Sequence, residues 1–319
     1  MSSTIPKKPK IFVIILNYNG GTDLLKTIKS VVDSNYQNLE IILVDNNSTD
    51  NSLNLAEQWV ATHCSSEKNF SKIYFIKNKK NLGFGAGNNV GIKFAFENSA
   101  DYVFLLNNDA LVRKNTISKL IDSIKDESEI GLVSPVIYSD LKYKNIWFCG
   151  GKINWWKMRA EHFDCISLFG RKWFQVVFGR ERFQTVPYTD VEETEYVTGC
   201  AMLISKKVFE KVGLFDEFFF LYYEDADLSL RVKKAELKNL IVPSAKVYHQ
   251  EQSEENQSQK IYWLVLSGIL FFRKHGKGFW KIYLNIYLFL RKLKNYLDVK
   301  FRPTKINLAV RRAYLDVKN

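Results

Sequence analysis

Three carboxylates stand directly behind six aromatic or aliphatic residues in the stretch FFFLYYEDADLSLRVKK at 218–234. A charge in apolar surroundings is unfavourable unless it is paired or performs chemistry. A helix that begins near Glu224 would pair Asp227 with Arg231, four residues later on the same face. Glu224 and Asp225 have no such local partner, and burial would raise the pKa of either carboxyl toward that of a general base. Two interpretations of this pair stay open: a catalytic base, or acids that only stabilise the first turn of a helix.

A single carboxylate, Asp109, follows a fully apolar run in LLNNDALV at 105–112. Oxygen ligands of this kind suit Mg²⁺ or Mn²⁺, which often joins one or two carboxylates to substrate phosphates. A turn rich in Asn and Asp is the alternative interpretation. His249, in KVYHQE, ends another apolar run and becomes a candidate ligand only if Asp109 needs a nitrogen partner.

A glycine-rich turn, NLGFGAGNNVG at 81–91, follows an apolar run and opens a helical pattern. Asn88 stands where a dinucleotide fingerprint needs its third glycine, although Asp109 after the next apolar run could still bind a ribose. Glycines interleaved with asparagines also let backbone and side-chain amides approach a sugar or a diphosphate. Both interpretations require a nucleotide-type α/β scaffold.

The first 130 residues predict such a scaffold. Apolar, β-branched runs predict buried parallel strands at 11–16, 40–44, 73–76 and 102–106, and helical patterns lie between them at 22–34, 50–62 and 86–98. Ligands bind at the carboxyl ends of strands in a doubly wound sheet. Asp45, which follows the second run in LVDNNSTDNS, is therefore placed to bond a base or ribose. Ser48 and Asp50 are explained as helix caps.

The second half predicts fewer regular elements. A strand is expected at 196–204, then a short helix with Ser205 as N-cap and Gly213 beyond its end. Two short strands are expected near 240–242 and 246–248.

Two apolar runs near the C-terminus, 261–272 and 279–290, are edged with Lys and Arg. Each is shorter than the roughly 20 residues that span a bilayer. They predict either helices that lie at a membrane interface or core helices that cap the domain.

The composition is globular, with 46% hydrophobic residues among 319, and the net charge is +12. This charge suggests an anionic partner, but no RNA- or DNA-binding signature is present, so nucleic acid is not expected. The four cysteines form no CxxC pair and are expected to be reduced, as in a cytoplasmic protein.

Six blocks, in this order, resemble the family 2 glycosyltransferases of the rhamnosyltransferase type over about residues 10–250: VIILNYNG, LVDNNSTDNS, NLGFGAGNNVGIKFA, FLLNNDALV, VTGCAMLISKKVFEKVGLFDEFFFLYYEDADLSLRVKKA and VYHQE. The resemblance implies an α/β fold of the GT-A type, a Rossmann-like nucleotide-binding sheet with a fused acceptor-binding half, here followed by C-terminal amphipathic helices. It divides the chain into a nucleotide-sugar half (1–130), an acceptor and catalytic-base half (131–250) and basic, aromatic C-terminal helices (251–319).

Carried over residue by residue, the resemblance assigns donor and metal sites. The expected donor-binding residues are Leu16, Asn17, Tyr18, Asn19, Asp45, Asn81, Gly83, Gly87, Asn88, Asn107 and Asn108. Asp109 and His249 would bind Mg²⁺ or Mn²⁺. Glu224-Asp225 matches the acidic pair that supplies the catalytic base, with Asp225 preferred.

The implied reaction is an inverting transfer of rhamnose or another hexose from a dTDP- or UDP-linked donor. The acceptor would be a glycan or a polyprenyl-linked sugar in cell-surface polysaccharide synthesis, with the enzyme peripheral at the inner face of the membrane. A nucleotidyltransferase or dehydrogenase, and a non-catalytic membrane-associated relative, are the alternatives.

Two departures from the family pattern bear on these expectations. The metal motif begins with Asn107, so one carboxylate stands where many relatives have two, and a cation would depend on the diphosphate for further ligands. Ala235-Glu236 replaces the glycine that relatives usually have after this helix, which should affect only the turn.

Overall fold

The computed structural model describes residues 8–63, 72–124, 129–163, 191–250 and 257–317. Its strands are β1 (Ile11–Asn17), β2 (Leu39–Asp45), β3 (Ile73–Lys77), β4 (Tyr102–Asn107), β5 (Ala110–Val112), β6 (Ile130–Tyr138), β7 (Ile146–Phe148), β8 (Gly151–Asn154), β9 (Arg159–His162), β10 (Glu192–Thr194), β11 (Ala201–Ser205) and β12 (Lys238–His249). Its helices are α1 (Asp23–Val32), α2 (Ser52–His63), α3 (Phe84–Glu97), α4 (Thr116–Asp122), α6 (Lys206–Val212), α7 (Glu224–Lys234), α8 (Gln257–His275), α9 (Phe279–Phe301) and α10 (Lys305–Asp316).

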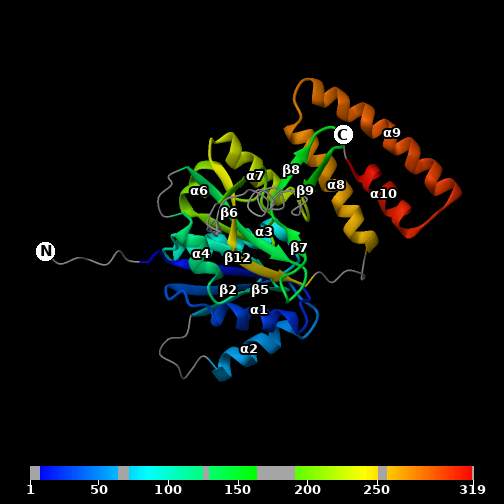
Figure 1. Ribbon diagram of the computed structural model, residues 1–319. Coiled ribbons are helices and arrows are strands. Elements are labelled where there is room, and N and C mark those ends of the chain that lie inside the picture. Colours follow the sequence, from blue (N-terminus) through cyan, green and yellow to red (C-terminus); the bar gives the residue numbers. More distant parts are fainter. Residues whose placement is uncertain (1–7, 64–71, 125–128, 164–190, 251–256, 318–319) are drawn as a thin grey trace, which may run out of the picture.

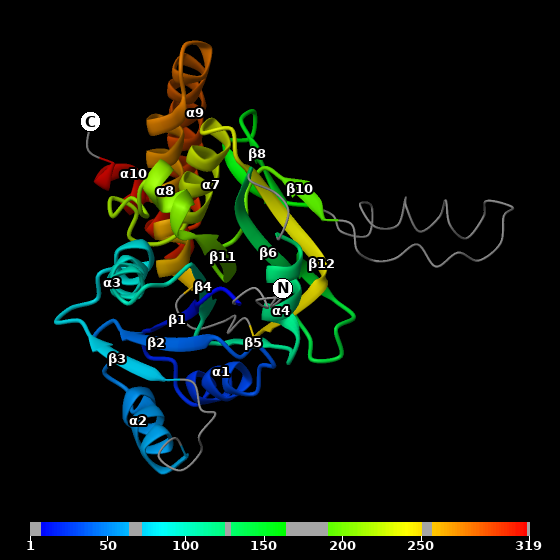
Figure 2. The same ribbon diagram turned by 90° about the vertical axis from the view of Figure 1, so that its left-hand side faces the viewer.

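Ten of the described strands form one continuous sheet in the order β10-β12-β6-β11-β4-β1-β2-β3, with β5 paired to β12 and β7 to β6. Helices α1 and α2 lie on one side of β1–β3 and α3 on the other (Figures 1 and 2). The four strands predicted in the first 130 residues are confirmed as parallel neighbours β1–β4. Their apolar, β-branched sequences fit because the residues of β1 and β2 are buried almost without exception.

The parallel register brings the polar strand ends to one edge of the sheet. Asn17 pairs with Asp45 across β1 and β2, and Leu16 pairs with Asn107 across β1 and β4. The loops that follow these strands therefore meet at the carboxyl edge, where ligands bind in open α/β sheets.

The second half differs from the prediction in two places. The strand expected at 196–204 begins only at Ala201: Tyr196 makes an isolated bridge to Gly151, and residues 199–200 form a turn before β11. The two short strands expected near 240–242 and 246–248 are one strand, β12, whose register against β6 shifts between Val242 and Lys246. An interruption of this kind leaves one strand bent, and the sequence shows it as two apolar runs.

The turn after α7 contains a strained residue. Glu236 adopts φ 61°, a left-handed conformation, at the place where the resemblance expects a glycine. Replacing Glu236 with glycine is expected to raise the free energy of unfolding by about 1 kcal/mol, because glycine adopts this conformation without steric strain. Chemical unfolding monitored by circular dichroism measures the change. Ala235→Gly is the matched control, because Ala235 has φ −89° and should gain nothing. Equal or lower stability of Glu236→Gly would contradict the prediction.

The caps predicted for α6 are confirmed. The Ser205 side chain accepts a hydrogen bond from the Val208 amide, and Gly213, at φ 78°, follows the last helical residue.

The cysteine prediction is wrong for Cys149, which is disulfide-bonded. Sequence spacing does not show which cysteines approach each other in space. Cys200 is free and buried, as expected, and Cys64 and Cys165 lie outside the described residues.

The two apolar C-terminal runs lie in different environments. The first lies in α8, whose Gly268, Phe271 and Phe272 are buried against the main body of the protein. The second lies in α9, which projects from the body together with α10 (Figures 1 and 2). Within the described part of the chain, no helix is both long enough and apolar enough to cross a membrane.

Candidate active site

A buried polar network ties together the ends of β1, β2 and β4. Asn17 donates from Nδ2 to Asp45 Oδ1 at 2.8 Å and accepts at Oδ1 from Asn108 Nδ2 at 3.1 Å. The second Asp45 oxygen accepts from the Ser48 amide. Asp45 is only 4% exposed, so it holds the loop after β2 in place, and its expected contact with a base or ribose stays a prediction. Tyr18, by contrast, is half exposed beside this network.

The glycine-rich turn, which carries several of the expected donor-binding residues, lies beside the carboxyl edge of the sheet. Asn81 bonds through Oδ1 to the Asn46 side chain and to the Gly83 amide. Asn88 is buried and donates to the Phe84 carbonyl of its own helix. A Cβ on Gly87 would collide with Leu16. The glycine-rich turn is therefore supported from the protein interior by Asn88, Gly87 and Leu16. Asn19, which accepts the Thr49 amide at Oδ1, holds the neighbouring loop.

Asn46 is a site residue that sequence reasoning missed. Its Nδ2 donates to Asn81 and to the Gly83 carbonyl, and its Oδ1 accepts from Asn78 Nδ2. This side chain, only 2% exposed, locks the glycine-rich turn to the end of β2. The only sequence signal was an asparagine directly after Asp45, inside a segment already rich in polar residues.

The glycine-rich turn lies directly on the aromatic run before α7. The Phe84 amide donates to the Phe220 carbonyl at 2.8 Å. Gly83 has φ 86°, and a Cβ there would collide with that same carbonyl. Glycine is thus required for two reasons, and the contact brings the turn close to the acidic pair at 224–225.

The acidic pair occupies the first turn of α7, as predicted. Two consecutive tyrosines, Tyr222 and Tyr223, precede it in the left-handed conformation, with φ 66° and 68°. Asp225 is half-buried and accepts from the amides of Gly199 (3.1 Å) and Ala226 (2.7 Å). The left-handed backbone of the two tyrosines is strained, and such strain is found where the surrounding structure fixes a functional group in place.

The two carboxyls of the pair differ in their surroundings. Burial, reinforced by the charge of Asp225, raises the pKa of Glu224 well above its ordinary value. Burial also raises the pKa of Asp225, but the amide hydrogens of Gly199 and Ala226 counteract it. Burial therefore disfavours the ionised form of Glu224, and Asp225 is the better candidate for the ionised carboxylate of the pair.

Glu224→Gln is expected to stabilise the protein, increasingly so as the pH rises. The folded protein keeps the Glu224 proton above pH 4.5, where the unfolded chain releases it, so the free energy of unfolding falls with rising pH. Glutamine removes this titration. The melting temperatures of the variant and the wild type, measured at pH 5 and pH 8, should differ more at pH 8. A difference that shrinks with pH would contradict the raised pKa.

The two predicted metal ligands are brought together by antiparallel pairing of β5 with β12, which places Ala110 opposite His249. Asp109 Oδ1 lies 3.2 Å from His249 Nε2. Burial lowers the pKa of His249, but Cys200 and Asp109 more than offset it and raise the pKa to about 11. The Trp147 ring contacts the imidazole at 4.8 Å between centroids.

Among the described residues, four buried side-chain atoms lack a hydrogen bond, and three belong to these two pairs: Asp109 Oδ1, His249 Nδ1 and Glu224 Oε2, of which Asp109 Oδ1 still forms the ion pair with His249 Nε2. Buried polar atoms are normally satisfied, so such atoms point to an absent ligand. No cluster of three or more His, Cys, Asp or Glu side chains suited to a metal occurs in the described ranges. Asp109 and His249 fit a cation that takes its other ligands from a diphosphate.

The turn before β11 contacts both the acidic pair Glu224-Asp225 and the segment that carries Asp109. Gly199 donates its amide to Asp225, and the carbonyl of the next residue, Cys200, accepts the Asn107 amide beside Asp109. A Cβ on Gly199 would press on the Phe84 ring. The base candidate and the metal candidates therefore lie on either side of one short turn.

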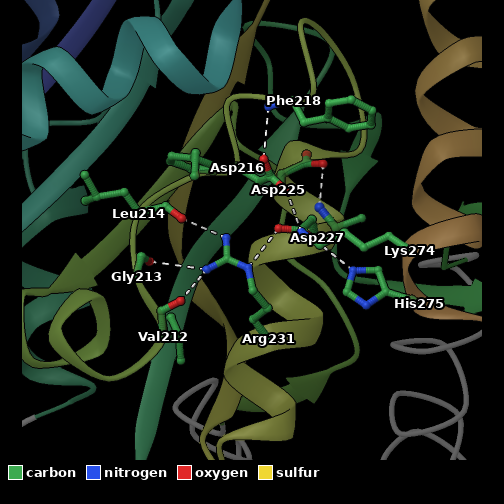
Figure 3. Close-up of polar contacts among 12 residues, drawn as sticks. Val212, Gly213, Leu214, Asp216, Phe218, Asp225, Asp227, Arg231, Lys274 and His275 are labelled. Atoms are coloured by element: carbon green, nitrogen blue, oxygen red, sulfur yellow. Dashed lines mark hydrogen bonds and ion pairs between the residues drawn. The ribbon is translucent and has the colours of Figure 1, made fainter.

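A buried ion cluster fixes the far side of α7 (Figure 3). The Asp227 carboxylate, fully buried, contacts Arg231, as predicted, and also Lys274 and His275 at the end of α8. Arg231 additionally donates to the carbonyls of 212–214. Burial raises the pKa of Asp227, but its hydrogen bonds with His275 and Lys274 and the Arg231 charge more than offset this and lower the pKa to about 2. The cluster holds α7, and with it the acidic pair, against α8.

The chain is similar in sequence to known glycosyltransferases. The chain is 26% identical over 224 residues to the low-salt glycan biosynthesis hexosyltransferase Agl10 of Haloferax volcanii, covering 70% of this chain and 61% of that protein. It is 24% identical over 252 residues to the N-acetylglucosaminyl-diphospho-decaprenol L-rhamnosyltransferase of Mycobacterium tuberculosis, covering 74% and 75%.

The fold is shared with glycosyltransferases of the GT-A type. The mannosyltransferase PcManGT of Pyrobaculum calidifontis, solved with GDP-Man and Mn²⁺, superposes with a TM-score of 0.58 at 15% identity, over 98% of this chain and 77% of that one. The family model described as glycosyl transferase family 2 matches residues 12–213. The α/β fold and the rhamnosyltransferase-like resemblance are thereby confirmed, and the chain belongs to glycosyl transferase family 2.

Proposed function

We propose that this glycosyltransferase moves rhamnose or another hexose, with inversion, from a dTDP- or UDP-linked donor to a hydroxyl of a glycan or polyprenyl-linked acceptor. Cell-surface polysaccharide synthesis at the cytoplasmic face of the membrane is the proposed setting. One observation carries the proposal: the Asp109–His249 pair and the buried, unbonded Glu224 Oε2 flank the single turn that holds Asp225.

Each residue then has one task. Asp225 accepts the proton of the attacking acceptor hydroxyl, and the Gly199 and Ala226 amides keep its carboxylate aimed. Glu224, protonated, can donate a hydrogen bond to a sugar hydroxyl. Asp109 and His249 would hold Mg²⁺ or Mn²⁺, which when bound neutralises charge on the leaving diphosphate. The network around Asn17 and Asp45 supports the nucleoside end.

The donor and acceptor classes are supported by the relatives. The Mycobacterium tuberculosis protein is named for rhamnosyl transfer to a lipid-linked N-acetylglucosaminyl diphosphate. PcManGT was solved with a nucleotide sugar and Mn²⁺. An acceptor carried on a polyprenyl diphosphate would also suit the net charge of +12.

The direct test is transfer itself. Purified protein is incubated with UDP-, dTDP- and GDP-sugars, Mn²⁺, and a short-chain polyprenyl-diphospho-N-acetylglucosamine acceptor. Mass spectrometry detects the product, and NMR of the anomeric proton gives its configuration. A product of inverted configuration from one donor is expected. Retained configuration, or pyrophosphate release in place of sugar transfer, would contradict the proposal.

A further inference from the structure

One side of α9 carries exposed apolar side chains along its whole length. The exposed fraction of these side chains is between 45% and 73%; they are Phe279, Ile282, Ile286, Phe289, Leu290, Leu293, Tyr296, Leu297 and Phe301, together called the α9 face. At about 100° per residue they fall within one arc of about 140°, which also includes the exposed Lys300 in the last turn of the helix. The helix is about 35 Å long, so the face is far more extensive than the isolated exposed apolar residues of ordinary surfaces.

The opposite side of α9 is packed on protein. Leu284 and Leu288 are buried there, and at the border of the α9 face the Tyr283 hydroxyl donates to the Trp156 carbonyl at 2.8 Å. The Tyr287 hydroxyl donates to the Lys157 carbonyl at 3.2 Å. The helix is therefore already seated by one side, and the α9 face is a second surface that α8 and α10 do not cover.

The borders of the α9 face are basic. With the same angular spacing, Lys281 and Lys292 follow one border of the arc and Lys294 follows the other. Asp298 is the sole acidic residue in the α9 sequence. A second copy of α9 on this face would bring lysine borders against lysine borders. Lipid phosphates instead complement them, and a basic, aromatic, apolar helix of this kind suits the interface of an anionic bilayer.

The β8–β9 hairpin connects the α9 face to the region of the acidic pair. Trp156, 62% exposed at the hairpin turn, packs against Phe279 with ring centroids 5.9 Å apart. On the same hairpin the Ala160 amide donates to the Tyr223 hydroxyl at 3.4 Å, directly before Glu224. One rigid hairpin thus separates the exposed apolar surface from the acidic pair.

We propose that the α9 face, extended by Trp156, binds the surface of a bilayer containing anionic lipids, with α9 lying in the interface. This deepens the proposed function, because it would present a lipid-linked acceptor to the acidic pair across the hairpin. The apolar side chains enter the acyl boundary, and Lys281, Lys292 and Lys294 meet lipid phosphates.

Vesicle co-sedimentation of the full chain tests the proposal without donor, acceptor or turnover, so it can fail independently of the proposed reaction. Wild-type protein should bind phosphatidylcholine vesicles with 30% phosphatidylglycerol much more tightly than pure phosphatidylcholine. Lys281→Gln/Lys292→Gln/Lys294→Gln should weaken binding to the anionic vesicles about 100-fold. Ile286→Ser/Phe289→Ser/Leu293→Ser should weaken it at least about tenfold.

The control replaces an equally exposed leucine and a lysine away from α9, in Leu141→Ser/Lys142→Gln, which should bind like wild type. Circular dichroism melting of every variant shows that the fold is intact, since the replaced side chains are exposed. Two results would overturn the proposal. One is equal vesicle binding by the wild type and the Ser variant. The other is a wild-type protein that binds no vesicles and sediments as a dimer, while the Ser variant sediments as a monomer.

Discussion

Asp225→Asn is expected to lower kcat about a thousandfold while nucleotide binding is retained. A positioned general base accelerates proton transfer by about 10²–10⁴-fold, and asparagine cannot accept the acceptor proton. The Gly199 amide donates to Oδ2 and the Ala226 amide to Oδ1, so the asparagine oxygen can keep one of these two bonds, and thermal unfolding of the variant checks that the turn stays folded. Steady-state kinetics give kcat and KM, and calorimetry gives the affinity for the nucleoside diphosphate.

Glu224→Gln is the matched control for this prediction. Burial favours the protonated form of Glu224 by raising its pKa, and glutamine imitates that form. We expect its kcat to stay within about tenfold of wild type. If Glu224→Gln were the damaging substitution and Asp225→Asn nearly neutral, the two roles would have to be exchanged.

Asp227→Asn is expected to lower the free energy of unfolding by about 3–5 kcal/mol. The substitution removes the fully buried counter-ion of Arg231, whose side chain is 20% exposed, while Lys274 keeps Asp216, and breaking a buried ion pair from one side is strongly destabilising. Urea unfolding measures the change. Asp216→Asn is the control, because Asp216 also contacts Lys274 but is about one third exposed and should contribute less than about 1 kcal/mol.

The same cluster sets a pH dependence. The pKa of Asp227 is lowered from 3.8 to about 2, so its stabilisation is fully present above pH 4 and is lost as the pH falls toward 2. Wild type should therefore lose its advantage over Asp227→Asn in that range. A difference below 1 kcal/mol at pH 7 would show that the cluster does not hold α7 against α8.

The strands at the donor edge could be predicted because β1, β2 and β4 are buried on both faces and read as continuous apolar runs, and the half-buried β3 is apolar over four residues. The pairing of Asp227 with Arg231 could be predicted because it is local to one helix. The proximity of Asp109 to His249 depends on β5 pairing with β12, which no local pattern reveals. The resemblance to a family placed both in one site, and the structure brings them to 3.2 Å.

The residues missed by sequence reasoning act over long distances in the chain. Asn46, Gly199 and Trp147 acquire their contacts only when segments far apart in the chain meet: the loop after β2, the turn before β11 and strand β7. Likewise, runs 261–272 and 279–290 have nearly the same composition, and only packing distinguishes the buried α8 from the exposed α9. Composition sets how apolar a helix is, but its tertiary neighbours decide which side is covered.

The most direct test of the central claim is nucleoside diphosphate release from a panel of UDP-, dTDP- and GDP-sugars, with Mn²⁺, Mg²⁺ or EDTA, by wild-type protein and by Asp109→Ala. The account predicts release from one donor, dependent on the cation and lost in Asp109→Ala, while the variant remains folded. Release that neither EDTA nor Asp109→Ala affects would contradict the assignment of Asp109 and His249 as the site of a catalytic cation.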